Sequence, residues 1–168
     1  MIIPYGQKVP KIHESVFIAE GSFIIGDVEI DEHSSVWFNC VIRGDVNYIR
    51  VGKRTNIQDG SVLHVTREKY PLIIGNNVSI GHGAILHGCR IGNDVLIGIG
   101  AIVLDGVIVG DGSIVGAGSV VMEGTIIPPN TLFAGIPAQF KKELSEKDRE
   151  RISATVRNYM HYASVYLG

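Results

Sequence analysis

An apolar residue returns at every sixth position along most of this chain, and this period constrains the fold more than any other feature. Glycine often follows the apolar residue, which favours a turn at each step. The positions form four runs: Ile12, Ile18, Ile24, Ile30, Val36 and Ile42; Val51, Ile57 and Leu63; Ile74, Ile80 and Leu86; and Ile91, Ile97, Val103, Val109, Val115, Val121, Ile127 and Phe133.

A period of six matches neither the 3.6 residues per turn of a helix nor the simple alternation of one long strand. It fits short strands, each followed by a turn and each contributing one aliphatic residue to the interior. Three such hexads make a coil of about 18 residues, and strands of successive coils pair at roughly 4.8 Å. We therefore predict an all-β prism of stacked coils, a parallel β-helix, over roughly residues 10 to 135.

The chain after the repeat has a helical pattern. Ser145 is expected to be an N-cap, with Asp148 three residues later in the position of a capping box. Apolar residues then recur at helical spacing, which predicts a helix over about 146–166 that packs on the prism. We expect a β-helix domain at 1–140 and a C-terminal helical segment at 141–168. The apolar positions are Ile152, Val156, Tyr159, Ala163 and Tyr166.

Composition excludes several classes of protein. The formal net charge is −2, which provides no electrostatic reason to expect a nucleic-acid or membrane partner. The N-terminus lacks the pattern of a signal peptide, and no apolar run approaches the roughly 20 residues of a spanning helix. The two cysteines, Cys40 and Cys89, fit a reducing compartment, so we expect a cytoplasmic protein.

The repeat slips three times, after Ile42, Leu63 and Leu86, and breaks in a regular pattern are where function is expected. His64 and His87 directly follow the second and third of these core residues. One full coil separates the two histidines, so both should lie at the same corner, about one strand spacing apart. Two imidazoles placed in this way can share a metal ion at roughly 2.0–2.1 Å each.

His82 follows Ile80 by two residues and should emerge at a different corner of the prism. In a threefold assembly it would meet the histidine pair of a neighbouring subunit. This geometry predicts a homotrimer with three metal sites at its interfaces and no complete site in one chain. The alternative is that these histidines are ordinary hydrogen-bonded residues. Cys89 and Cys40 are less favoured as additional soft ligands.

Three segments together resemble the γ-class carbonic anhydrase family: Arg43-Gly44-Asp45, Asn56 through His64, and Gly81 through Gly88. The hexad itself is similar to that of left-handed β-helices, and we take the handedness from this resemblance because parallel crossovers are generally right-handed. The resemblance implies a trimer with zinc, or Fe²⁺ instead, at the interfaces, and a site of three histidines also suits Co²⁺. It also implies that His64 and His87 come from one subunit and His82 from its neighbour.

The implied activity is hydration of CO2 to bicarbonate through a metal-bound hydroxide. Gln58 matches a position beside the bound water, and Asn56 matches a neighbouring polar position. Arg43 and Asp45 match a pair that bonds across the subunit boundary, and Asp59 matches a carboxylate in the same network. A purely structural role for these three charged residues remains open, since an interfacial ion pair can fix register without touching substrate.

The chain departs from the family pattern where protons leave the site. Arg67 stands where well-studied members carry a glutamate, and Val46 stands where a second carboxylate occurs. Glu68 is an alternative proton carrier. Tyr159 and His161 fall near family positions that approach the site, although His161 also reads as a solvated helix residue.

Two other functions remain open from the sequence. One is a metal-dependent thioesterase or another acyl-CoA-related hexapeptide enzyme, because acyltransferases share this repeat. The other is a non-catalytic metal-binding trimer, in which the missing shuttle carboxylates reflect lost turnover.

Overall fold

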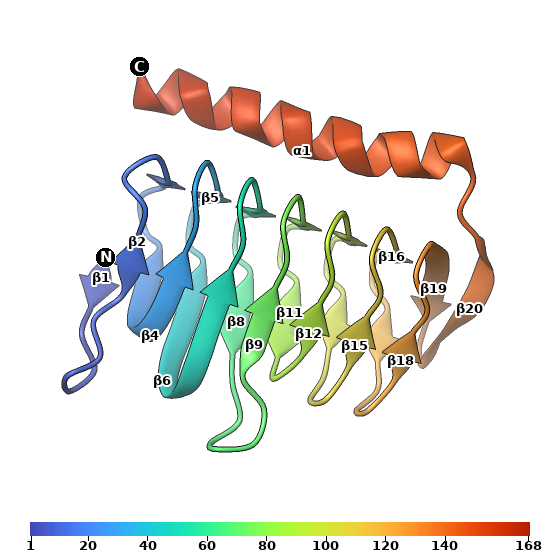
Figure 1. Cartoon of the computed structure of the whole chain (residues 1–168), viewed down its shortest axis with the longest axis horizontal. Helices are drawn as coiled ribbons and strands as arrows, with labels where there is room; N and C mark the ends of the chain where they lie inside the picture. Colours follow the sequence, from blue (N-terminus) through green and yellow to red (C-terminus); the bar gives the residue numbers. More distant parts are fainter.

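The computed structural model describes residues 1–168 as twenty strands, wound into a triangular prism, and one long helix (Figure 1). Nearly all the strands are short and pair in parallel with strands one coil away. The first face of the prism is an eight-stranded sheet. Its members are β3 (Phe17–Ile18), β5 (Ser35–Val36), β7 (Asn56–Ile57), β10 (Ser79–Ile80), β13 (Leu96–Ile97), β16 (Ile114–Val115), β19 (Thr131–Gly135) and β20 (Ala138–Glu143).

The second and third faces join into one twelve-stranded sheet, because β4 (Phe23–Ile30) and β6 (Val41–Val51) run through the corner between them. The second face continues with β8 (Val62–His64), β11 (Ile85–His87), β14 (Ile102–Val103) and β17 (Val120–Val121), and β1 (Ile2–Ile3) pairs at its start. The third face contains β2 (Lys11–Ile12), β9 (Leu72–Ile74), β12 (Arg90–Ile91), β15 (Ile108–Val109) and β18 (Ile126–Ile127).

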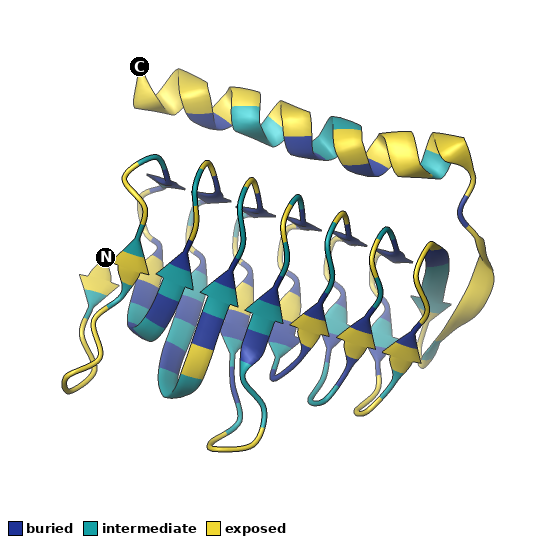
Figure 2. Ribbon diagram, viewed as in Figure 1, coloured by how far each residue is buried: buried dark blue, intermediate teal, exposed yellow.

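The hexad residues form the core, as the sequence predicts. All of them are buried except Ile12, Ile18 and Phe133, which lie toward the ends of the stack and are partly buried. Figure 2 shows the buried residues running from coil to coil inside the prism. The glycines beside the core allow the coils to approach, because a Cβ on Gly81 would lie 2.6 Å from the backbone nitrogen of Ile99.

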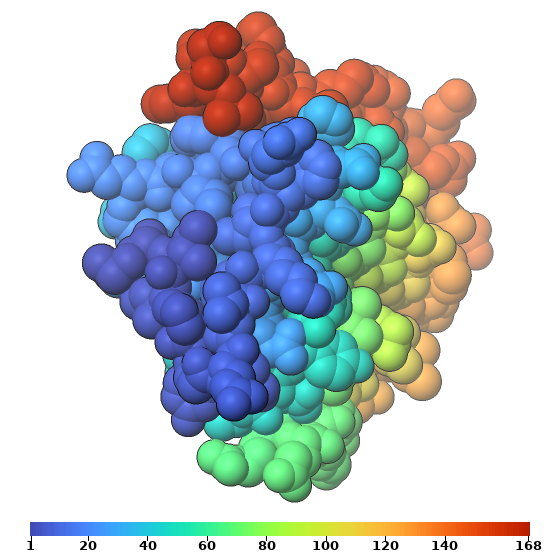
Figure 3. All heavy atoms as spheres, turned by 60° about the vertical axis from the view of Figure 1, so that its left-hand side comes forward, coloured from blue at the N-terminus to red at the C-terminus, as the bar shows by residue number.

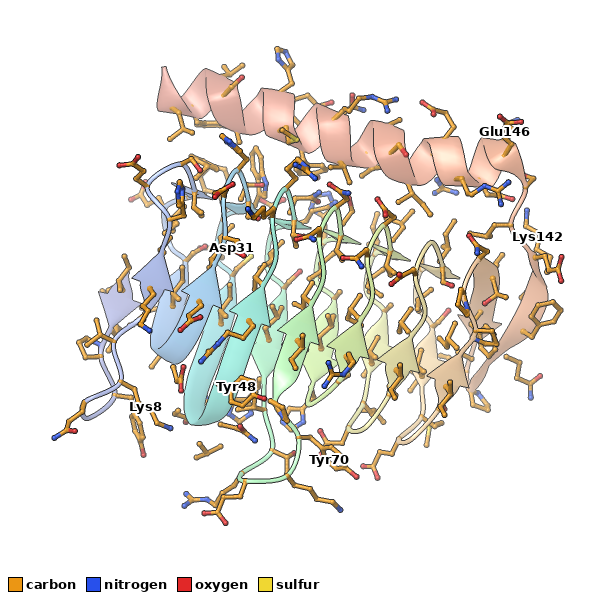
Figure 4. All side chains as sticks on the ribbon, in the orientation of Figure 1. Lys8, Asp31, Tyr48, Tyr70, Lys142 and Glu146 are labelled. Atoms are coloured by element: carbon orange, nitrogen blue, oxygen red, sulfur yellow. The ribbon has the colours of Figure 1, made fainter.

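Two of the three breaks in the repeat add residues and become local extensions of an otherwise regular stack, whereas the third shortens the step from Leu86 to Ile91 by one residue. The extra residues of the first break, after Ile42, lie within β6, the longest strand. The second forms a loop at residues 65–71 that projects from the prism (Figures 1 and 3). A backbone pairing between Thr66 and Tyr70 closes this loop, and Tyr70 lies at its base (Figure 4). The extra residues therefore leave the core undisturbed and build out one corner.

The helix α1 (Glu146–Leu167) runs back along the prism over the first face (Figure 1). Its predicted start is confirmed, since Ser145 and Asp148 form a capping box. Hydrogen bonds from Lys142 and Ser145 hold the pKa of the Asp148 carboxyl well below its usual range. Strand β20 lies across the expected domain boundary at residue 140 and leads directly into the helix.

Two small apolar clusters attach the helix to the first face. Ile152 packs with Leu96 and Ile114 near one end, and Ala163 packs with Phe17 and Trp37 near the other. This single helix lacks an apolar stretch long enough to cross a membrane.

Candidate metal centre

His64 and His87 lie side by side at the end of two neighbouring strands of the second face. The strand register pairs their Cα positions directly, which confirms the predicted shared corner. Their ring centroids lie 5.0 Å apart with an interplanar angle of 60°, and Nδ1 of His64 lies 3.1 Å from Nε2 of His87. The stacking of one coil on the next therefore brings two potential nitrogen ligands into the same small volume.

Each of these rings has a carboxylate on its far side. The Nε2 of His64 lies 3.1 Å from Oδ1 of Asp45, and the Nδ1 of His87 lies 2.6 Å from Oδ1 of Asp105. An ionised carboxylate can only accept, so these two ring nitrogens donate. The remaining nitrogens, which face each other, then each present a lone pair.

The surroundings of His64 favour its neutral form. Burial lowers the pKa of His64, and the nearby Arg43 adds to this effect against the opposing pull of Asp45. Partial burial would raise the pKa of Asp45, but hydrogen bonds from His64 and Arg43 hold that pKa below its usual range. A neutral histidine beside an ionised carboxylate is the form in which a histidine binds a metal.

His82 lies at another corner, in the turn that precedes β11, as its place in the hexad predicts. Its Nδ1 is 2.7 Å from Oδ2 of Asp59, and its Nε2 is 3.3 Å from the hydroxyl of Tyr159 on α1. Burial, with the charge of Asp59, raises the pKa of Tyr159 to about 12. The ring of His82 is thus held by a carboxylate, as the other two are, but its contacts are with Asp59 and Tyr159 and not with those two histidines.

Gln58 and Asn56 form a buried polar row beside this second corner. Gln58 Nε2 donates to Asn56 Oδ1 at 3.0 Å, and Asn56 Nδ2 donates to Ser79 Oγ at 2.8 Å. Gln58 and Tyr159 also line a largely apolar cavity of about 520 Å³ between the first face and α1. The amide of Gln58 is therefore fixed in orientation at one end of a cavity that a small molecule can enter.

His64 and His87 provide two nitrogens at a separation that suits one metal ion. Two nitrogens bound to a tetrahedral zinc at about 2.0–2.1 Å lie about 3.3–3.4 Å apart, close to the observed 3.1 Å. Two facing lone pairs repel unless a metal ion or a proton lies between them. Within one chain, no group of three histidine, cysteine, aspartate or glutamate side chains could hold an ion.

The other predicted site residues fall into two groups. Arg43 forms an ion pair with Asp45 inside one chain, so a bond across a subunit boundary stays a prediction. Arg67, Glu68 and His161 are exposed, and none of them contacts the three histidines.

The two cysteines lie in the hydrophobic core and point to no ligand role. Burial raises the pKa of Cys40 to about 11 and also raises that of Cys89.

One residue of the site, Asp105, is not among those that the sequence predicts. Asp105 contacts His87 and also accepts a hydrogen bond from Thr66 Oγ1 at 2.5 Å. The coil length provides the signal, because Asp105 follows His87 by 18 residues, one coil along the same corner.

Comparison with known proteins supports the assignment of a family. The profile of a family described as dynactin subunit 5 matches residues 10–166. A carbonic anhydrase of Geobacillus kaustophilus is 49% identical over 166 residues, which cover 99% of this chain and 91% of that protein. Gamma carbonic anhydrase 2 of Arabidopsis thaliana mitochondria is 42% identical over 95% of this chain. The chain spans 59% of the length of that plant relative.

Among solved structures, a Bacillus cereus protein with a provisional acetyltransferase assignment is 48% identical and superposes with a TM-score of 0.97. The match covers 99% of this chain and 96% of that one, and it confirms the left-handed β-helix of hexapeptide repeats. The acetyltransferase assignment describes that Bacillus cereus protein. The sequence matches to the two carbonic anhydrases cover the coils that carry all three histidines. The chain therefore belongs to the γ-class carbonic anhydrase family.

Proposed function

We propose that this protein is a metal-dependent enzyme that hydrates CO2 to bicarbonate, acting as a homotrimer with zinc, or Fe²⁺ or Co²⁺, at its subunit interfaces. The facing nitrogens of His64 and His87 carry this proposal, because they lie 3.1 Å apart, a separation at which one metal ion can bind both. His82 of a neighbouring subunit would supply the third nitrogen, and a water molecule would take the open fourth position.

The outer surface of the second face supports the trimer. Its outward positions form an unbroken ladder of apolar side chains, and the ladder lies between the corner of His82 and the corner of His64 and His87. Phe23, Val62 and Ile85 are between 37% and 39% exposed in one chain. The full ladder is Phe23, Val41, Val62, Ile85, Ile102 and Val120.

Covering this ladder would bring the two corners of adjacent subunits together. A head-to-tail contact that closes after three subunits uses the same two surfaces three times, so each interface would receive one His82 and one histidine pair. Burial of apolar side chains is favourable, at roughly 25 cal/mol per Å². The interface that completes the metal site is therefore also the one that removes the exposed apolar ladder from water.

The roles of the chain's own residues follow from their contacts. When bound, the ion supplies a Lewis acid that lowers the pKa of a water ligand to about 7. Asp45 and Asp59 accept hydrogen bonds from His64 and His82 and so leave the opposite ring nitrogens, which would bind the ion, unprotonated. The amide of Gln58, oriented by Asn56, is placed to hydrogen-bond an oxygen of CO2 or bicarbonate.

Proton release should depend on the solvent. Arg67 occupies the position of the family's shuttle glutamate and is exposed, and Glu68 beside it has no contact with the site. We expect the hydration rate to rise steeply with buffer concentration, because an external base then removes the proton.

Stopped-flow measurement of CO2 hydration tests the proposal, on protein shown to carry one zinc per chain. His87→Ala is the matched control, since it removes one ligand at a partly buried position and leaves the core residue Leu86 unchanged. The wild type should hydrate CO2 and the variant should not. Zinc-loaded wild type that shows no hydration, even in concentrated buffer, would refute the activity.

The trimer has its own test. Ile85→Glu places a charge in the apolar ladder and should convert trimers to monomers in sedimentation or light scattering. Ile108→Glu makes the same change at an equally exposed position of the third face, where it should leave the assembly intact. A trimer that persists in Ile85→Glu but dissociates in Ile108→Glu would show that the interface is not formed by the apolar ladder of the second face.

A second candidate function is metal-assisted hydrolysis of an ester or thioester. The cavity of about 520 Å³ favours it, because CO2 needs far less room and Leu96, Ile114 and Leu132 could line an acyl chain. Hydrolysis of acyl-CoA esters by the zinc protein, with Leu132→Trp to fill the cavity, separates the two. A thioesterase should lose activity on this substitution, whereas CO2 hydration should persist.

A further inference from the structure

Asp105 lies outside the three segments that resemble the family, yet it contacts a histidine of the candidate site. It lies in the turn between β14 and β15, one coil after His87. Its Oδ1 accepts from Nδ1 of His87 at 2.6 Å, and its Oδ2 accepts from the hydroxyl of Thr66 at 2.5 Å. Both carboxylate oxygens are therefore engaged, which fixes the plane of the carboxylate and with it the plane of the imidazole.

The loop at residues 65–71 builds the other side of this contact. Thr66 is held by the side chain of Asn47, whose Nδ2 donates to the Thr66 carbonyl at 2.9 Å. Tyr70, at the far end of the loop, packs on Gly106, where a Cβ would lie 3.2 Å from Cε1 of the ring. The loop that contains the five extra residues after Leu63 therefore packs against the turn that carries Asp105 and supports it.

Gly88 leaves the space that this arrangement needs. It has φ +52°, and a Cβ there would collide with Oδ1 of Asp105 and lie 2.7 Å from Cβ of Tyr70. The residue after the ligand histidine is therefore glycine for two reasons: its backbone conformation and the closeness of the carboxylate. No comparable clearance is required at Gly60, where a Cβ would meet nothing.

We propose that Asp105, braced by Thr66, is a positioning residue that holds His87 in the tautomer and orientation required for metal binding. The hydrogen bond from Nδ1 leaves Nε2 of His87 unprotonated and aimed at Nδ1 of His64. The loop, through Thr66, then serves to position a ligand. The inference rests on the proposed metal site and adds the third member of a set, since each of the three histidines then has its own carboxylate: Asp45, Asp59 and Asp105.

The test is the zinc dissociation constant, measured by competition with a chromophoric chelator, for Asp105→Ala and Asp105→Asn. Loss of such a partner typically weakens metal binding about 10–100-fold. The alanine variant should show this loss, and asparagine, whose carbonyl oxygen still accepts a hydrogen bond, should fall between it and the wild type. Asparagine also keeps the shape of the side chain, so it remains informative should the alanine variant fail to fold.

Asp111→Asn is the matched control. Asp111 has the same place in the hexad one face later, and its Oδ1 accepts from the backbone N–H of Asn93 at 2.7 Å and from no histidine. This variant should bind zinc as tightly as the wild type. An unchanged dissociation constant in Asp105→Ala, or an equal loss in Asp111→Asn, would overturn the positioning role.

A second readout needs neither metal nor turnover. The ¹⁵N–¹H NMR spectrum of the zinc-free protein reports which ring nitrogen of His87 carries the proton. The wild type should show Nδ1–H, and Asp105→Ala should lose this preference. Wild-type protein that binds no zinc would refute the proposed function, and the tautomer of His87 would then decide by itself whether Asp105 orients the ring. A mixed tautomer in the wild type would overturn the inference while leaving the metal site standing.

Discussion

Two variants that each fail to bind zinc alone should restore zinc sites when they share a trimer. His82→Ala removes the single histidine of one corner but keeps the pair at the other, and His87→Ala does the opposite. Within one chain, His64 and His87 have facing nitrogens 3.1 Å apart, whereas His82 is turned toward Asp59 and α1. Only a site shared between chains can combine the intact parts of the two variants.

The size of the effect follows from the symmetry. Each interface of a head-to-tail trimer would use His82 of one subunit and the pair of the next. A trimer that contains both variants, in either proportion, has one interface at which a His87→Ala subunit donates its intact His82 to a His82→Ala subunit. Mixed trimers should therefore bind about one zinc ion, against about three for the wild type.

The assay uses co-expression of the two variants with different affinity tags and purification through both tags. Only mixed trimers survive this selection, and atomic absorption then measures zinc per trimer. Each variant expressed alone should carry none. Mixed trimers without zinc would refute the shared site, because a site built within one chain cannot be complemented. Zinc retained by His82→Ala alone would refute the role of that residue as a ligand.

Three further predictions concern the fold. Ile97→Ala should lower the free energy of unfolding, measured in guanidinium, by about 2–5 kcal/mol, because Ile97 is fully buried. Ile126→Ala, at a 68% exposed position, should change that free energy by less than about 0.5 kcal/mol. Equal losses in the two variants would contradict the stacked core. The helix cap should weaken as pH falls below about 4, since the folded-state pKa of Asp148 lies below its unfolded value. The melting temperature of Asp148→Asn should therefore fall less over that pH range than the melting temperature of the wild type. Cys40 and Cys89 should react slowly with a disulfide reagent at neutral pH and promptly after unfolding, because burial raises both thiol pKa values; fast reaction of the native protein would contradict their place in the core.

The repeat by itself determined most of the architecture. A core residue at every sixth position admits few arrangements other than stacked coils, because each strand has one inward side chain and each turn must return the chain to the next face. The same arithmetic predicts that His64 and His87 share a corner, and the strand register confirms it. Ser145 and Asp148 likewise mark the start of α1, because capping depends on neighbours in the sequence.

The handedness did not follow from the period, since a sixfold repeat is compatible with either sense of winding. It came from the likeness of this hexad to a known family, and the Bacillus cereus structure confirms it.

The tertiary structure alone decided how the side chains of the site are arranged. The position of Tyr159 over His82 depends on how α1 docks on the first face, and the contact of Asp105 with His87 depends on side-chain rotamers in two different coils. Cys89, which the sequence leaves open as a ligand, points into the core instead. The physical reason is the same in each case: the period sets where a backbone position lies, whereas packing and hydrogen bonding between distant segments set where its side chain points.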